Sequence, residues 1–162
     1  MKKDPGNDGA TFLLAQVGAH AGAKFAARMQ AIELTPPLVG VLRFLARNPR
    51  STQRELAEAI GMPASRLVAM IDELERRKFV RRVRDDEDRR SHRITLTAGG
   101  EAELTIIAKA AREHKNELLA ALSPEEQEQL AGLLQRIAVQ QRLRPGIHPG
   151  LSRRPSGEQG EP

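Results

Sequence analysis

The chain carries, at residues Val80–Thr97, the stretch VRRVRDDEDRRSHRITLT. Arginines and β-branched residues make up both ends, and an acidic-then-basic segment lies between them. The pattern predicts two short β-strands joined by an exposed tip, because charged side chains are almost never fully buried without partners. A thin basic ribbon suits nucleic-acid contact, since its arginines can lie along phosphates or enter a groove.

The positive charge of the chain is concentrated around this hairpin. Between residues 76 and 93, nine basic residues stand against four acidic ones, a net charge of +5, which equals the net charge of the whole chain. Such a balance favours a polyanionic partner, with nucleic acid ahead of an anionic membrane. Aromatic residues make up only 2% of the chain, with no Trp or Tyr. The core should therefore be aliphatic and built of helices packed against helices.

Several classes of function lack the residues that they need. The chain has no cysteine, which excludes disulfides, thiol redox chemistry and thiolate metal sites. Its histidines and carboxylates do not have the spacing of metal ligands. The chain also has no nucleophile motif and no Gly-rich phosphate-binding loop. We therefore expect no cofactor, no metal and no enzyme activity. No apolar run approaches the roughly 20 residues needed to span a bilayer, and residues 1–10 lack the apolar core of a signal peptide. We therefore expect a cytoplasmic protein without a membrane partner.

A helix-turn-helix is predicted directly before the hairpin. Thr52 and Glu55 have the spacing of a capping box, which fixes a helix start. Gly61 is placed to supply a left-handed C-terminal cap, and a second helix follows from Ala64 to about Lys78. Two short helices joined by a tight turn form a helix-turn-helix, and a basic hairpin directly after it makes a winged helix.

The helices outside this unit carry more apolar surface than a small winged helix needs. Periodic apolar residues predict helices over Thr11–Leu34, about Pro36–Ala46 and Ala98–Leu122, and Ser123-Pro124 starts a last one. The surplus at both chain ends predicts a helical dimer interface. The fold class is therefore mainly α with a small β-hairpin wing, a winged helix-turn-helix with a dimerisation region from both termini.

The chain divides accordingly into five segments. We expect a flexible arm at 1–10, a dimerisation helix at 11–34 and a winged helix-turn-helix DNA-binding domain at 35–97. Dimerisation helices follow at 98–141, and a Pro- and Gly-rich tail at 142–162 is predicted to be disordered.

From about Leu34 to Leu104 the residues resemble the MarR family of bacterial transcription regulators. The segments that carry the resemblance are QRELAEAIGM, IDELERRKFVRR and DEDRRSHRITLTAGG. The resemblance implies a homodimer on double-stranded DNA, with each recognition helix in a major groove and the wings reaching toward minor grooves. It implies base contacts from the start of the recognition helix, phosphate contacts from the start of the preceding helix, and contacts from the tip of the wing. In this chain the base contacts would come from Ser65 and Arg66, and the phosphate contacts from Ser51, Thr52 and Arg54. The wing-tip contacts would come from Asp88, Arg89 and Arg90, where Asp88 orients Arg90.

The resemblance also implies a repressor that a small-molecule effector releases from a pseudo-palindromic operator. The effector would bind between the dimer helices and the DNA-binding domain and change the distance between the two recognition helices, which must lie ~34 Å apart to engage both half-sites. The candidate residues are Phe25, Met29, Leu38, Val41, Phe44 and Leu104. Each of them, taken singly, also fits a plain core position.

Three positions depart from the family pattern. Pro63 stands where relatives have an Asp cap, Ala69 where a basic residue is common, and Lys78 where glycine is usual. Lys78 matters most, because that position often needs a left-handed backbone. Either Lys78 adopts that conformation or the helix ends differently.

A second class of function stays open on this evidence. The chain could be a winged-helix interaction module that binds nucleic acid non-specifically, or a protein partner, without a ligand switch. A regulator should prefer its specific duplex over a scrambled one by ~10³ or more, whereas such a module should not.

Overall fold

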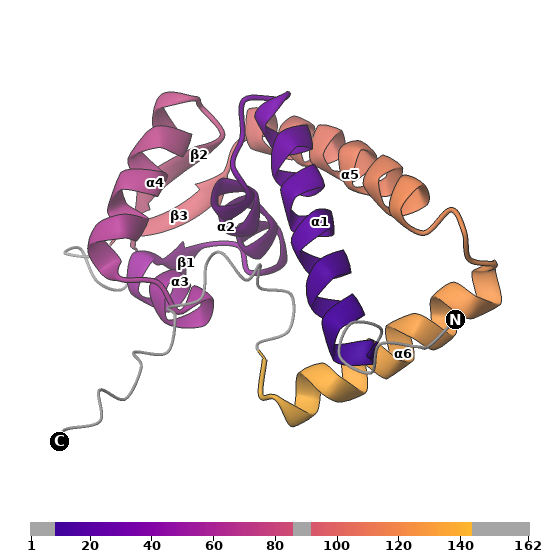
Figure 1. The fold of residues 1–162 in the computed structure, drawn as a ribbon. Helices are drawn as coiled ribbons and strands as arrows, with labels where there is room; N and C mark the ends of the chain where they lie inside the picture. The colour runs from indigo at the N-terminus through magenta and orange to yellow at the C-terminus, as the bar shows by residue number, and fades with distance from the viewer. Residues whose placement is uncertain (1–8, 86–91, 144–162) are drawn as a thin grey trace, which may run out of the picture.

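The computed structural model describes residues 9–85 and 92–143. In these ranges the chain forms six helices and three short strands. They are α1 (Ala10–Gln30), α2 (Pro36–Arg47), β1 (Ser51–Thr52), α3 (Gln53–Ile60), α4 (Ala64–Arg76), β2 (Val80–Arg84), β3 (His92–Leu96), α5 (Ala98–Leu118) and α6 (Pro124–Gln140). The sheet, α3 and α4 gather at one end of the molecule, whereas α1, α5 and α6 lie at the other, with α2 between them (Figure 1).

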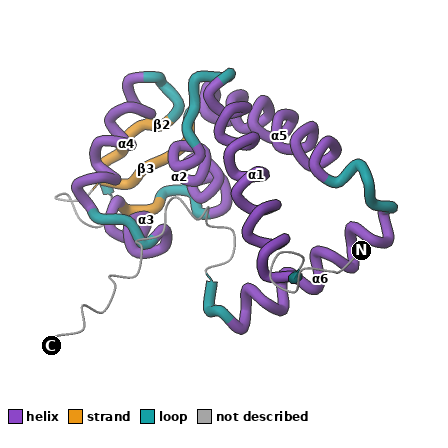
Figure 2. The backbone as a smooth tube through the Cα atoms, viewed as in Figure 1, coloured by secondary structure: helices purple, strands orange, loops and turns teal. Residues whose placement is uncertain are grey.

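The three strands form one small antiparallel sheet in the order β1-β3-β2. The pairs Val80↔Leu96 and Arg84↔His92 set the register of β2 on β3, which confirms the predicted hairpin strands. The two-residue strand β1 was not predicted, since it is too short to show a period and exists only through its pairing with β3 (Figure 2). The wing-tip residues Asp88, Arg89 and Arg90 lie outside the described residues.

The core lies where α2, α3 and α4 meet the sheet and the adjoining ends of α1 and α5. Its buried members are aliphatic, as the composition predicted, and each contributes about 1.5–3 kcal/mol by leaving water. They include Met29, Leu38, Val41, Leu42, Leu45, Leu56, Ile60, Leu67, Ile71, Leu74, Val80, Ile94 and Ile107.

The helix starts that were predicted from capping residues are confirmed. Thr52 accepts a hydrogen bond from the Glu55 amide at 3.2 Å, and the Thr52 amide donates to the Glu55 carboxylate at 2.7 Å, which completes a capping box. A second capping box joins Ser123 to Glu126 at the start of α6. Gly61 ends α3 with φ 72°, the left-handed conformation expected of it.

Helix α4 ends two residues earlier than predicted, and Lys78 adopts the left-handed conformation with φ 61°. The Lys78 amide donates to the Glu75 carbonyl and the Phe79 amide to the Leu74 carbonyl, both at 2.9 Å. These two bonds form a Schellman cap. Helix α1 stops at Gln30 and α5 at Leu118, also before the predicted ends. Beyond α1, Ile32 and Leu34 pack on the core, which extended the apparent helical period of that segment.

Lys78→Gly is expected to raise the free energy of unfolding by about 1 kcal/mol, because glycine adopts φ > 0 without the steric cost that other residues carry. Urea unfolding measures the change. Lys78→Ala is the matched control, since it removes the charge but keeps the strained backbone, and it should bring no gain. Equal stabilisation by both variants would assign the effect to charge instead.

Large apolar faces of α1 and α6 have no partner within the described residues. Of the predicted stripe on α1 only Met29 is buried, whereas Leu13 and Val17 are about half exposed. Helix α6 buries none of its residues. The remaining exposed apolar side chains of the two helices are Phe12, Leu14, Leu133, Leu134, Ile137 and Val139.

Candidate nucleic-acid interface

Helix α4 presents one face to the core and the opposite face to solvent. Leu67, Met70, Ile71 and Leu74 are buried, whereas its first turn is exposed. Pro63 caps α4 without a side-chain hydrogen bond, and its carbonyl accepts from the amides of residues 66 and 67, both at 3.1 Å. The predicted base-reading residues Ser65 and Arg66 both lie on the exposed first turn.

The three predicted phosphate-contacting residues differ in what they offer. Ser51 is buried and its hydroxyl donates to the Asn48 carbonyl at 2.8 Å, while the Thr52 hydroxyl serves the α3 capping box. Their side chains thus hold the start of α3 in place. Arg54 is 86% exposed and pairs with Glu58 one turn later at 2.8 Å, which raises the pKa of Arg54. Of the three, Arg54 is the one that carries a charge at the surface.

Arg82 of β2 joins the wing to α4, a role that the sequence did not suggest. Its guanidinium contacts the carboxylates of Asp72 and Glu75, and its amide donates to Glu75 at 2.9 Å. Burial opposes the charge of Arg82, but the hydrogen bonds to these two acids outweigh it and raise its pKa. The sequence did contain a signal for this contact, since Asp72 and Glu75 lie three residues apart near the end of a helix and a basic strand follows. The contacts fix the wing's first strand against the recognition helix.

A second ion pair joins β3 to the residue that directly follows β2. The Arg93 Nε lies 2.7 Å from an oxygen of Asp85, whose side chain is only 6% exposed. Arg93 also donates to the Arg50 carbonyl at 3.1 Å. The sequence predicted that the acidic segment between the two strands forms an exposed tip, and for Asp85 this was wrong, because its carboxylate is buried against Arg93. The cost of burying that carboxylate is offset by the paired guanidinium.

The six candidate effector residues belong to one hydrophobic cluster. Met29, Leu38 and Val41 are fully buried, whereas Phe25, Phe44 and Leu104 are partly buried against them. All six side chains therefore lie in the core or pack against it.

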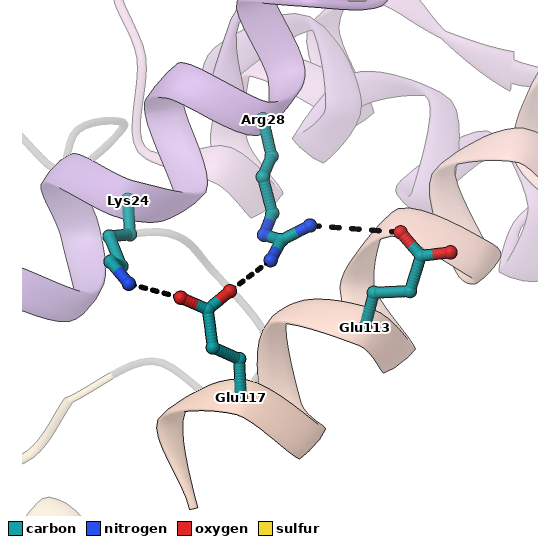
Figure 3. Close-up of polar contacts among 4 residues, drawn as sticks. All are labelled: Lys24, Arg28, Glu113 and Glu117. Atoms are coloured by element: carbon teal, nitrogen blue, oxygen red, sulfur yellow. Dashed lines mark hydrogen bonds and ion pairs between the residues drawn. The ribbon is translucent and has the colours of Figure 1, made fainter.

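A row of charged residues connects α1 to α5 beside this cluster (Figure 3). Lys24 and Arg28 of α1 both contact the Glu117 carboxylate, and Arg28 lies 3.6 Å from Glu113. The Lys24 and Arg28 hydrogen bonds lower the pKa of Glu117. Within the described residues no cluster of three metal-binding side chains occurs.

His114 of α5 lies beside Phe25 of α1, with the two ring centroids 5.6 Å apart. Its Nδ1 is buried and has no hydrogen-bond partner among the described residues. Burial lowers the pKa of His114 below 6.5, and the neighbouring Arg28, Lys24 and His20 act in the same direction, against Glu117. Protonation of the ring therefore opposes the packing of α1 on α5.

The free energy of unfolding should accordingly fall as the pH decreases from about 6.5, because the unfolded chain binds this proton more readily than the folded one. Urea midpoints between about pH 8 and pH 5 measure the effect. His114→Gln should reduce the slope in this range. An unaltered slope in His114→Gln would contradict the assignment.

Comparison with known proteins places this arrangement in a family. A MarR family model matches residues 32–91. The transcriptional regulator HosA of Escherichia coli is 34% identical over 105 residues, which cover 65% of this chain and 78% of HosA. This chain belongs to the MarR family. A candidate transcriptional regulatory protein for the hcr operon of Thauera aromatica is 33% identical, over 64% of this chain and 63% of that protein, just under two thirds of its length.

Solved MarR-family structures share the fold. The transcriptional repressor CouR, in a structure bound to a 23-mer DNA duplex, is 31% identical with a TM-score of 0.72, over 85% of this chain and 98% of CouR. The apo form of MarR from Escherichia coli is 22% identical with a TM-score of 0.71, over 80% of this chain and 96% of MarR, and supports the fold alone. The predicted winged helix-turn-helix is thus confirmed. None of the described helices is long and apolar enough to cross a membrane.

Proposed function

We propose that this MarR-family protein is a homodimeric transcriptional repressor, acting in the cytoplasm, that binds a pseudo-palindromic operator. The observation that carries the proposal is the solvent-facing first turn of α4, which offers Ser65 and Arg66 beside a wing base fixed by Arg82. The relative CouR, named a repressor and bound to DNA, supports the same use of the fold.

The unpartnered faces of α1 and α6 support the homodimer. Apolar patches of this kind on a soluble protein mark interaction sites, and a two-fold axis would let each copy cover the other. In this proposal, 11–34 and 98–141 form the dimerisation region and 35–97 reads DNA. The two α4 helices would lie one DNA turn, ~34 Å, apart.

Three groups of residues take the DNA contacts in this proposal. Arg66 hydrogen-bonds a base, with Ser65 beside it, and Arg54 meets phosphate through its exposed guanidinium. Ser51 and Thr52 position α3 through the bonds described above. The wing-tip residues Asp88, Arg89 and Arg90 lie outside the described residues and remain proposed groove and phosphate contacts.

The effector proposal concerns the junction of α1, α2 and α5. A small ligand that inserts among Phe25, Phe44 and Leu104, the partly buried members of the cluster, would displace α1 and α5 relative to α2. Met29, Leu38 and Val41 would then line its inner wall. Such a shift would change the spacing of the recognition helices and release the operator.

A duplex selected from a random pool, titrated beside a scrambled duplex at two salt concentrations, tests the proposal. We expect specific binding to be ~10³-fold or more tighter. Arg66→Ala should cost ~1–3 kcal/mol on the selected duplex by removing a bidentate base contact. Arg112→Ala, an exposed arginine of α5, is the matched control and should change little.

Equal affinity for both duplexes, together with a steep salt dependence, would overturn the regulator proposal. That outcome would favour the alternative, an interaction module whose basic surface binds nucleic acid without sequence preference.

A further inference from the structure

Val68 is an apolar side chain on the outward face of the DNA-reading helix. It is 41% exposed, whereas the larger apolar residues of α4, Leu67, Met70, Ile71 and Leu74, are buried. It lies three residues after Ser65 and therefore on the same side of the helix.

The residues around Val68 leave room for a group from outside. A hollow of about 330 Å³ lies between α3 and α4. Its apolar wall consists of Ala57, Ala64, Leu67 and Val68. Ala64, which lines the hollow next to Val68, is small and exposed.

The rim of the hollow is polar. Gln53, Arg54 and Glu58 complete its lining. The Gln53 Nε2 is buried and finds no hydrogen-bond partner within the described chain, and the exposed guanidinium of Arg54 stands at the same edge. An apolar floor with the Gln53 amide and the Arg54–Glu58 ion pair at its rim fits a ligand that is apolar at one point and polar beside it.

The DNA major groove presents such a combination at one base. Thymine is the base that carries a methyl group there, at C5, and phosphates flank the groove on both sides. We infer that Val68 reads a thymine methyl group of the operator and thereby contributes to sequence specificity. The inference rests on the proposed function, because it requires α4 to enter the major groove.

A purely internal role for Val68 is the competing explanation. In that case its side chain would pack on Ala57 of α3 and stabilise the helix-turn-helix without touching DNA. The two roles differ in one observable property, since an internal contact cannot depend on a methyl group of the DNA.

The test replaces each thymine of the selected operator with deoxyuridine, which removes only the methyl group. One thymine position in each half-site should respond. Substitution at that position in a single half-site should lower the affinity of the unaltered protein about fourfold, and substitution in both half-sites about sixteenfold. Val68→Ala should bind the thymine operator more weakly, and its affinity should not fall further with deoxyuridine at that position. Substitution of a thymine outside the half-sites is the DNA control and should have no effect.

The outcomes separate the two proposals. If no duplex is selected, the proposed function fails. If a duplex is selected but no deoxyuridine substitution weakens binding, or if Val68→Ala keeps the full methyl dependence, the reading by Val68 is overturned. Val68→Ser, which has no methyl group, provides the same comparison should Val68→Ala fold poorly. Arg112→Ala, the exposed arginine of α5 that serves as the control above, is the protein control here and should keep the methyl dependence.

Discussion

Gly100→Ala is expected to lower the free energy of unfolding by about 3 kcal/mol or more, because the added methyl group has no room. A Cβ at this position would lie 2.1 Å from the Phe79 carbonyl oxygen and 3.0 Å from a methyl carbon of Leu96. The carbonyl cannot easily move away, because it accepts the Thr97 amide at 3.0 Å. The start of α5 would have to separate from the end of α4 and from the wing.

Urea unfolding followed by circular dichroism measures the loss, and Gly132→Ala is the matched control. Nothing lies within 4 Å of a Cβ built on Gly132, which is an exposed residue of α6. That substitution should leave the stability unchanged or raise it by roughly 0.5–1 kcal/mol, because alanine favours the helix. If both variants unfold at the same urea concentration, the close contact at Gly100 does not constrain the fold.

The double substitution Leu133→Asp and Ile137→Asp is expected to convert the proposed dimer into a monomer. These side chains are 54% and 43% exposed on α6 and lie on one stripe, so carboxylates there should be tolerated in a single copy. A second copy packed against them would bury uncompensated charge, at a cost of several kcal/mol. Loss of the paired half-site contact should weaken operator binding by about 10²–10⁴-fold.

Sedimentation gives the oligomeric state and a duplex titration gives the affinity. Gln135→Asp adds a carboxylate on the opposite face of α6 and should leave both unchanged. A double variant that remains dimeric would exclude this face of α6 from the interface. The circular dichroism of the double variant should stay that of a folded winged helix, in contrast to Gly100→Ala, so the two substitutions separate loss of assembly from loss of fold.

Three sets of contacts in the structure explain why the wing is positioned as it is. Arg82 holds β2 to α4, Arg93 holds β3 to Asp85 and to the loop before β1, and Gly100 lets α5 pack against the end of α4. Part of the basic stretch in the sequence therefore holds the wing, and the proposed DNA contacts fall to other residues.

The sequence by itself determined the features that depend on residues within one helical turn of each other. The capping boxes at Thr52 and Ser123 and the left-handed Gly61 follow from local hydrogen bonds, which a short segment makes in any fold that contains it. The amphipathic periods located each helix for a similar reason. Lys78 was singled out by the family resemblance instead, because it stands where glycine is usual, and whether it would adopt φ > 0 stayed open until the structure was known.

Only the tertiary structure decided the features that join distant segments. The strand β1 exists through pairing with β3, some forty residues later. The burial of Asp85 depends on its ion pair with Arg93. The ion pairs of Arg82 depend on Asp72 and Glu75, which lie on the helix before its strand. The exposure of Val68, on a helix whose other large apolar residues are buried, also depends on how α3 and α4 pack. Charge and hydropathy are properties of single residues, whereas burial and pairing are set by which segments meet, and a linear pattern does not contain that information.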